Sequence, residues 1–269
     1  MTLAIPTFSR PHDVAIVMLS GGCAVMLACV LLHSRGLAAE NRPHVTRRAL
    51  GHWLPIAACV LVAVLLRHTE LAVALVLGTS VAALSGVTGF LLIAGPVEQT
   101  PPFAQPVWLF APIPVVLAFV LGIRGGLGLM DAGLLFAQGV LLLVLWIEMP
   151  ATNEPSPISP TPQLPGQLAW KTAELGLFLC LGAVGAWIAI RGCEQLAEVD
   201  RHYPFMATGA TILSVVLAMP IVNTSWPLAA SGRAWAPLTS QLGVVFLNLC
   251  VLLPAIIVFS VARPVLRPH

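Results

Sequence analysis

Charged residues are scarce in this chain, and their scarcity indicates the solvent in which it folds. Only 9% of its 269 residues are charged and 58% are hydrophobic, whereas soluble domains carry about 25% charged residues. The mean hydropathy is +0.93. We therefore predict an integral membrane protein with the lipid bilayer as its main partner. Its formal net charge of +2 is too small to indicate nucleic acid or an acidic substrate.

The sequence also lacks the patterns that mark enzymes, metal centres and disulfide frameworks. Its six cysteines are scattered and form no C-x-x-C pair, so we interpret them as small buried apolar side chains. The histidines form no H-x-x-x-H or E-x-x-H pair. No G-x-S-x-G, H-E-x-x-H or phosphate-binding glycine loop is present. We predict neither an enzyme nor a resident cofactor or metal.

What the chain does contain is a series of long apolar runs. About eight of them approach the roughly 20 residues that an α-helix needs to cross a bilayer. A spanning backbone must satisfy its own hydrogen bonds, and these runs are too long and too uniformly apolar for barrel strands, so we predict an all-α polytopic membrane bundle. The first run, from Val14 to Leu32, exceeds the core of a signal peptide and is interpreted as a retained helix. The expected spans lie near 13–33, 50–66, 71–95, 107–123, 127–149, 169–190, 205–229 and 236–262.

A proline-rich segment interrupts these runs. Residues Pro150 to Gly166 contain six prolines, which indicates an extended linker. We therefore divide the chain into an N-terminal membrane repeat of about five helices (1–149), a linker (150–168) and a C-terminal repeat of about three helices (169–269). An odd number of helices before the linker makes the second group enter the membrane from the opposite side, as inverted-topology repeats require. The alternative is an ordinary loop in an unrepeated bundle.

The basic residues and the overall composition indicate orientation and location. The loop after the first run contains four arginines, and the positive-inside rule places that loop in the cytoplasm. High alanine, arginine and proline with a single lysine are typical of a GC-rich bacterial genome, so we expect the bacterial inner membrane. The four arginines are Arg35, Arg42, Arg47 and Arg48.

Two isoleucines, Ile56 and Ile221, hold matching places in the two halves. Each follows a proline directly and precedes a glycine by 22 residues, namely Pro55 and Gly78 in the first half and Pro220 and Gly243 in the second. Both proline and glycine are abundant in this chain. The spacing alone therefore does not establish a repeat, and the surrounding sequence has to support it.

The surrounding sequence resembles the calcium/cation antiporter superfamily, which includes the sodium/calcium exchangers. Residues 209–221, GATILSVVLAMPI, fit the family pattern G-L-T-I-V-A-x-G-T-S-x-P-E without a gap. Residues 243–248 fit the following pattern G-S-N-I-x-N at its glycine and its last asparagine. In the first half, residues 52–56 and 78–83 occupy the same two places. The resemblance covers most of the chain and implies inverted repeats, alternating access and a ten-helix plan cut to about eight.

The departures from the family pattern concern its chemistry. In the family, a glutamate after each proline offsets the charge of a dehydrated cation, and broken helices lend backbone carbonyls. Here Ile56 and Ile221 stand at these two positions, so the resemblance implies an antiporter-like protein in which calcium exchange is lost. The positions left for a degenerate ion site are Thr79, Ser80, Asn248 and His52, and the expected helix breaks lie at Pro55, Pro220, Gly78 and Gly243.

Each of these polar positions also has a structural interpretation. Ser, Thr and Asn in membrane helices most often make interhelical hydrogen bonds. His52 stands at the family's threonine position, where it would titrate in a proton-coupled variant or would serve the packing alone. Two functions stay open. One is a divergent antiporter for monovalent cations or protons, and the other is a non-transporting scaffold that binds a partner.

Overall fold

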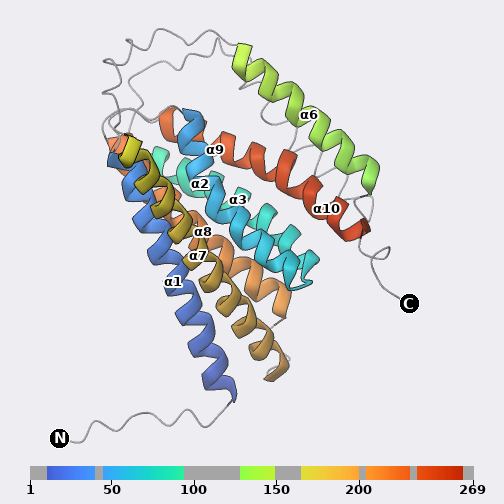
Figure 1. Cartoon of the computed structure of the whole chain (residues 1–269). Helices are drawn as coiled ribbons and strands as arrows, with labels where there is room; N and C mark the ends of the chain where they lie inside the picture. Colours follow the sequence, from blue (N-terminus) through green and yellow to red (C-terminus); the bar gives the residue numbers. More distant parts are fainter. Residues whose placement is uncertain are drawn as a thin grey trace, which may run out of the picture.

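The structure is a computed structural model that describes residues 11–39, 45–93, 128–148, 165–199, 204–230 and 235–262. Every regular element within these residues is helical (Figure 1). In chain order the helices are α1 (Pro11–Ala39), α2 (Val45–Leu65), α3 (Thr69–Ile93), α6 (Leu129–Glu148), α7 (Pro165–Val199), α8 (Phe205–Ala230) and a last continuous helix made of α9 (Trp235–Leu247), the π-helical turn η1 (Asn248–Leu252) and α10 (Leu253–Ala262).

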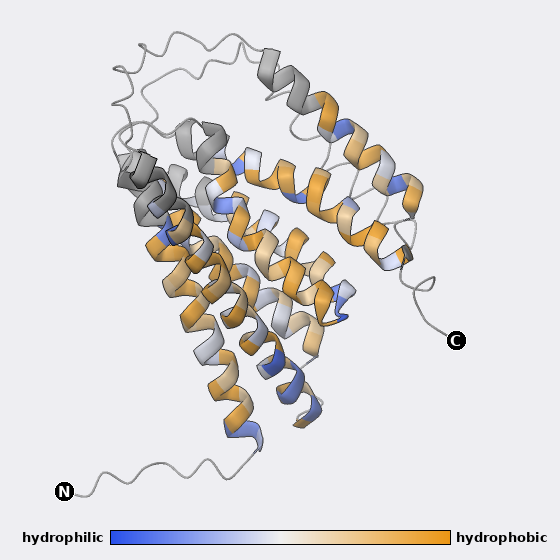
Figure 2. Ribbon diagram, in the orientation of Figure 1, coloured by the Kyte–Doolittle hydropathy of each residue, from blue (hydrophilic) through white to orange (hydrophobic). Residues whose placement is uncertain are grey.

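Seven of the eight expected spans coincide with these helices, and the span expected at 107–123 lies outside the described residues. Five described helices contain segments long and apolar enough to cross a membrane, while α2 and α6 contain shorter apolar stretches. Hydrophobic residues follow the helices along their length, and hydrophilic residues gather near several helix ends (Figure 2). The fold is therefore that of an integral membrane protein.

The predicted linker ends earlier than expected. Helix α7 begins at Pro165, so residues 165–168 belong to the helix, and the linker segment 150–164 lies outside the described residues. Proline is favoured at the first position of a helix, because its missing N–H would have no helical partner there and its φ angle is already helical. The proline-rich composition therefore did not predict the residue at which α7 begins.

Helices α1 and α7 come together through backbone-to-backbone contact at one side of the bundle (Figure 1). A β-carbon on Gly192 of α7 would lie only 2.5 Å from the backbone nitrogen of Leu19 in α1. A β-carbon on Gly185 would lie 3.0 Å from the carbonyl oxygen of Gly22. Small residues are the usual means of close helix packing in membranes, where dispersion contacts replace the hydrophobic effect. These glycines therefore hold the two helices as a pair.

The two halves of the chain interleave in the rest of the bundle. Helix α3 packs against α8, and α2 packs against α9, while α1 also touches α8 and α2 also touches α7. The buried core between them includes Leu75 and Val76 of α3 and Leu213 of α8. Helix α6 lies at the opposite side of the bundle from α1 and contacts α10 and η1 (Figure 1). Several buried polar side chains, among them His52, Thr79 and Asn248, lie where α2, α3, α8 and η1 meet.

The α2–α3 turn fixes one end of the bundle. Arg67 has a φ angle of 70°, and the backbone N–H of His68 donates to Ala63 O at 2.9 Å, which is the Schellman arrangement that ends many helices. The imidazole of His68 bonds to Glu194 of α7 and its ring centroid lies 4.7 Å from that of Phe205 in α8. The turn thus joins the first half of the chain to the second.

Candidate functional site

The two isoleucines of the matched positions are both part of the core. Ile56 in α2 is 0% exposed and Ile221 in α8 is 1% exposed. The neighbouring positions that the exchanger pattern fills with hydroxyls and amides are buried apolar residues as well. They are Ala83, Leu217, Ala218, Val244 and Val245. No buried side chain among the described residues is a carboxylate, so the centre of the bundle is uncharged unless a histidine is protonated.

The predicted helix breaks are not present at the predicted residues. Helices α2 and α8 run through Pro55 and Pro220, and α3 and α9 run through Gly78 and Gly243. Within the described helices, α-helical geometry is interrupted instead at η1, which begins at Asn248. A π-helical turn inside an α-helix often occurs at a functional position, because it turns side chains and carbonyls out of the regular pattern.

A histidine explains why α2 continues through its proline. Proline has no N–H, so Pro55 leaves the carbonyl of Gly51, four residues earlier, without its helical donor. The Nε2 atom of His33 in α1 lies 3.2 Å from Gly51 O. Because a carbonyl oxygen only accepts, this bond requires the proton of the imidazole on Nε2. The side chain of His33 therefore supplies the hydrogen bond that Pro55 removes.

A second histidine joins the two proline segments. His52 is 5% exposed, and its Nε2 lies 3.3 Å from Thr224 Oγ1 in α8. The Thr224 hydroxyl lies 3.0 Å from both Pro220 O and Ile221 O, to which it donates. This leaves the hydroxyl oxygen to accept from the imidazole N–H. Residue 52, three residues before Pro55, and residue 224, four residues after Pro220, are thus in contact across the halves.

The remaining predicted polar residues form one cluster between α3 and η1. Asn248 is fully buried, and its Nδ2 donates to Thr79 Oγ1 at 3.2 Å and to Ser80 Oγ at 3.0 Å. Both hydroxyls in turn donate to helix carbonyls, at 2.6 Å to Leu75 O and at 2.7 Å to Val76 O. The hydrogen-bonding groups of this cluster are therefore largely committed to one another and to the backbone.

Two buried oxygens in this region lack a hydrogen-bond donor. The Oδ1 atom of Asn248 has none, and neither does Ser214 Oγ in α8. Ser214 lies against Gly78, the residue before Thr79, so both oxygens adjoin the same short segment of α3. An unpaired buried oxygen is unfavourable and is the kind of atom that a water molecule or a cation satisfies. The oxygens are neutral, however, and supply no charge.

Sequence reasoning missed two further buried polar residues in α9. Ser240 is 3% and Gln241 is 1% exposed, and each has a side-chain oxygen without a donor. Two adjacent polar residues inside the apolar run 236–262 were the available signal. The role of His33 was also missed, because a histidine in one helix and a proline in another give no signal in the sequence that they act together. Within the described residues, no group of three or more His, Cys, Asp or Glu side chains is placed to hold a metal ion.

No protein-family model and no curated protein matches the sequence. The structure nevertheless resembles solved structures of the sodium-calcium exchanger NCX_Mj. One, soaked with Na⁺ and without Ca²⁺, has a TM-score of 0.56 at 14% identity and covers 92% of this chain and 83% of that chain. Two others, soaked with Na⁺ and Sr²⁺ or with Na⁺ and Ca²⁺, have a TM-score of 0.52 at 12% identity, with similar coverage.

These comparisons define the class of the protein at the level of its fold. It is an integral membrane protein with the fold of a sodium-calcium exchanger, and the part of the chain that the structure describes is helical. The resemblance to the cation antiporters expected from the motif residues is thus confirmed for the fold. At 14% identity or less, the chemistry of the site has to be argued from this chain's own residues.

Proposed function

We propose that this chain is a divergent cation-antiporter-like membrane protein in which calcium exchange is lost. The observation that carries the proposal is the burial of Ile56 and Ile221 at the two positions where the exchanger pattern has glutamates. A calcium ion takes six to eight oxygen ligands at about 2.3–2.6 Å, and negative ligands have to compensate for its lost hydration. Two isoleucine side chains supply neither ligands nor charge.

The polar cluster does not replace the missing acids. Asn248, Thr79 and Ser80 offer three neutral side-chain oxygens, and two of these already accept from the Asn248 amide. Placing even a monovalent ion in a medium of low dielectric costs of the order of 20 kcal/mol in the idealised limit, and a divalent ion costs more. Neutral oxygens offset only part of this cost. We therefore do not expect this centre to bind or transport calcium. The transported substrate that remains is a monovalent cation, or a proton carried by His52.

The inverted-repeat arrangement is part of the proposal, and the contacts between helices support it. If α1, α2 and α3 correspond to α7, α8 and α9, a two-fold axis converts each contact between halves into another. The contact of α3 with α8 then matches that of α2 with α9, and the contact of α1 with α8 matches that of α2 with α7. The α1–α7 contact maps onto itself. In transporters built from inverted repeats, alternating access is largely a rocking of one such half against the other.

A transport assay tests the proposed function directly. The purified chain and the exchanger NCX_Mj are reconstituted in parallel into liposomes loaded with sodium, and uptake of radioactive calcium is followed after dilution into sodium-free buffer. We expect calcium uptake by NCX_Mj and none above empty liposomes for this chain. Sodium-dependent calcium uptake by this chain would refute the proposal. Sodium-driven proton movement, recorded with a pH-sensitive dye in the same vesicles, decides whether the centre carries monovalent ions.

A non-transporting scaffold is the second candidate, and one observation favours it. The centre is filled by isoleucine, leucine and valine side chains, and its asparagine is bonded to two neighbouring hydroxyls. A protein of this kind keeps the exchanger fold as a frame for a membrane partner. Vesicles that move neither calcium, sodium nor protons, together with a stable complex recovered from native membranes, would establish this function over the first.

A further inference from the structure

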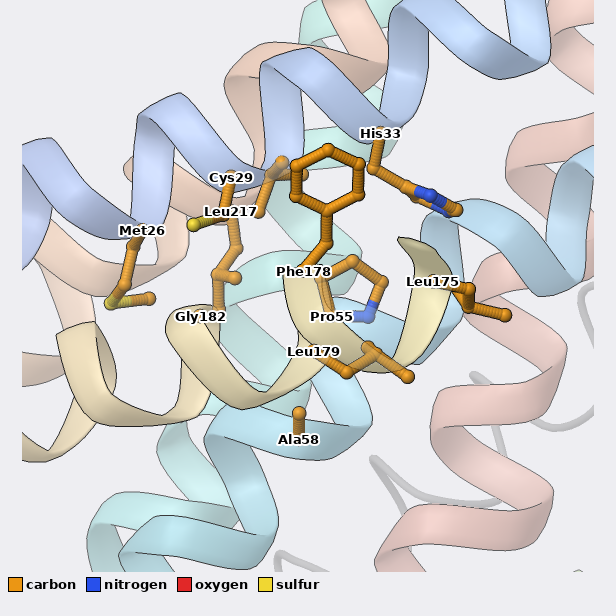
Figure 3. Close-up of a pocket in the computed structure, with 11 residues that line it drawn as sticks. Met26, Cys29, His33, Pro55, Ala58, Leu175, Phe178, Leu179, Gly182 and Leu217 are labelled. Carbon is orange, nitrogen blue, oxygen red and sulfur yellow. The ribbon is translucent and has the colours of Figure 1, made fainter. Parts of the chain in front are cut away.

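Two histidines that join helices, His33 and His68, have partners of different kinds. His33 lies beside Pro55 among apolar side chains of α1, α2 and α7, and its partner is a backbone carbonyl (Figure 3). His68 lies in the turn between α2 and α3, outside the candidate spanning segments, and its side chain is 25% exposed. Its partner is a carboxylate, that of Glu194 in α7. Protons from water therefore reach His68, and its partner responds to its charge.

The cluster around His68 draws side chains from the turn, α7 and α8. The Nε2 atom of His68 bonds to Glu194 Oε1, and Arg191 of α7 donates to Glu194 Oε2 at 2.7 Å. The ring centroid of Phe205, the first residue of α8, lies 4.7 Å from that of the imidazole. Because an ionised carboxylate only accepts, Nε2 carries a proton in this bond. Nδ1 is therefore the atom at which His68 gains or loses charge.

This cluster joins the α1–α7 pair to the rest of the bundle. Glu194 comes two residues after Gly192, where the backbones of α1 and α7 touch. Between these two residues, Cys193 places its Sγ 3.7 Å from the position of a β-carbon on Gly209 of α8. The turn, α7 and the start of α8 therefore meet at one junction. A change in the strength of the bond between His68 and Glu194 acts on that junction.

Acidic side chains outnumber arginines at this end of the bundle. Within its described residues α8 contributes no ionisable side chain, so the groups come from α1, the turn, α3 and the C-terminal part of α7. They are His12 and Asp13 of α1, Arg67 of the turn, Glu70 of α3, and Arg191, Cys193, Glu194 and Glu198 of α7. A proton taken up by His68 therefore reduces an excess of negative charge.

We propose that His68 and Glu194 form a proton-operated latch that ties α7 to the α2–α3 turn more firmly at acidic pH. Histidine is the side chain that changes its charge between about pH 5 and pH 8. When Nδ1 gains a proton, the bond that Nε2 already makes to Glu194 becomes charge-assisted. Such bonds are roughly twice as strong as neutral ones, which shifts the equilibrium toward the joined state by about fivefold. The latch does not depend on ion transport and acts equally in a transporter or a scaffold.

Hydrogen exchange at the turn tests the latch. The full chain in lipid nanodiscs is exchanged into deuterated buffer at about pH 5.5 and about pH 7.5, on either side of the range in which histidine titrates. The backbone N–H of His68 donates to Ala63 O, so peptides that contain it report the opening of the turn. After correction for the effect of pH on the chemical exchange rate, we expect exchange about fivefold slower at the lower pH.

Three variants separate the charge of the latch from its shape. His68→Gln keeps a side-chain N–H for Glu194 and cannot take up a proton. Glu194→Gln keeps an acceptor for His68 and has no charge. We expect both substitutions to abolish the effect of pH on the turn. His12→Gln removes another histidine at the same end of the bundle and is the matched control, in which the effect should remain.

Equal corrected exchange of the turn at the two pH values would overturn the proposal. This result comes from the unsubstituted chain, so it does not depend on how the variants fold. A pH effect of full size in His68→Gln, or its loss in His12→Gln, would also overturn the proposal, because another group would then be responsible.

Discussion

The hydrogen bond from His33 to Gly51 O gives the sharpest prediction about this fold. The substitution His33→Leu keeps a side chain of similar size and removes the donor. Gly51 is buried and Pro55 cannot donate to its carbonyl, so that carbonyl loses the donor that His33 supplies at 3.2 Å. Leaving one buried acceptor unsatisfied costs about 1–3 kcal/mol. We expect His33→Leu to destabilise the protein by that amount.

A double-mutant cycle isolates this bond from the other effects of the substitution. Pro55→Ala restores a backbone N–H at residue 55, which then donates to Gly51 O as in any α-helix. In that background the carbonyl no longer depends on His33, and His33→Leu should cost about 1–2 kcal/mol less than it does with Pro55 present. The packing change made by leucine is the same in both backgrounds and cancels in the difference.

The assay is unfolding in mixed micelles by increasing fractions of sodium dodecyl sulfate, followed by tryptophan fluorescence for all four proteins of the cycle. The free energy of unfolding of each variant gives the coupling between residues 33 and 55. A coupling near zero means that His33→Leu costs the same free energy of unfolding in both backgrounds. That result would show that α2 tolerates Pro55 without help from α1.

Three further predictions concern the centre, the turn and the helix pair. The double substitution Ile56→Glu and Ile221→Glu should lower the melting temperature in the absence of calcium, because each buried unpaired carboxylate costs several kcal/mol. Millimolar calcium should restore part of this loss. An equal response to calcium in the double Gln variant would contradict this prediction. Arg67→Gly should stabilise the protein by about 1 kcal/mol, since glycine adopts a φ of 70° without strain and alanine does not; chemical denaturation of the Gly and Ala variants compares them. Gly192→Val should destabilise it by about 1–3 kcal/mol through overpacking against α1, whereas Gly21→Val, which meets nothing within 4 Å, should be neutral in the same assay.

The sequence predicted the helices well because the bilayer imposes a simple rule on them. A run of apolar residues about as long as the hydrocarbon is thick has to be helical, and runs such as 71–95 and 205–229 needed no other information. The rule does not reach the boundaries. Pro165 belongs to the proline-rich segment by composition and to α7 by structure, because a helix accepts proline at its first position.

The site was predictable in its residues and not in its contacts. The motif placed Asn248 at a family position, but its partners Thr79 and Ser80 are 169 and 168 residues away, and only the tertiary fold brings them within 3.2 Å. The prediction of a helix break at Pro55 was wrong for a related reason. Whether a proline interrupts a helix depends on what satisfies the freed carbonyl, and here the donor is His33 on another helix. The residues next to Pro55 in the sequence do not indicate that such a donor exists.

Apolar residues at positions 56 and 221 are compatible with the exchanger fold for a physical reason. A buried carboxylate pair is costly when no cation is bound, and its replacement by apolar residues of similar size is often neutral or stabilising. Ile56 and Ile221 place two fully buried branched side chains where that cost would otherwise arise. The two isoleucines fill the core between the halves without that cost. The exchanger fold therefore does not require acids at these two positions, and here it surrounds a centre whose polar groups are mostly bonded to one another and to the backbone.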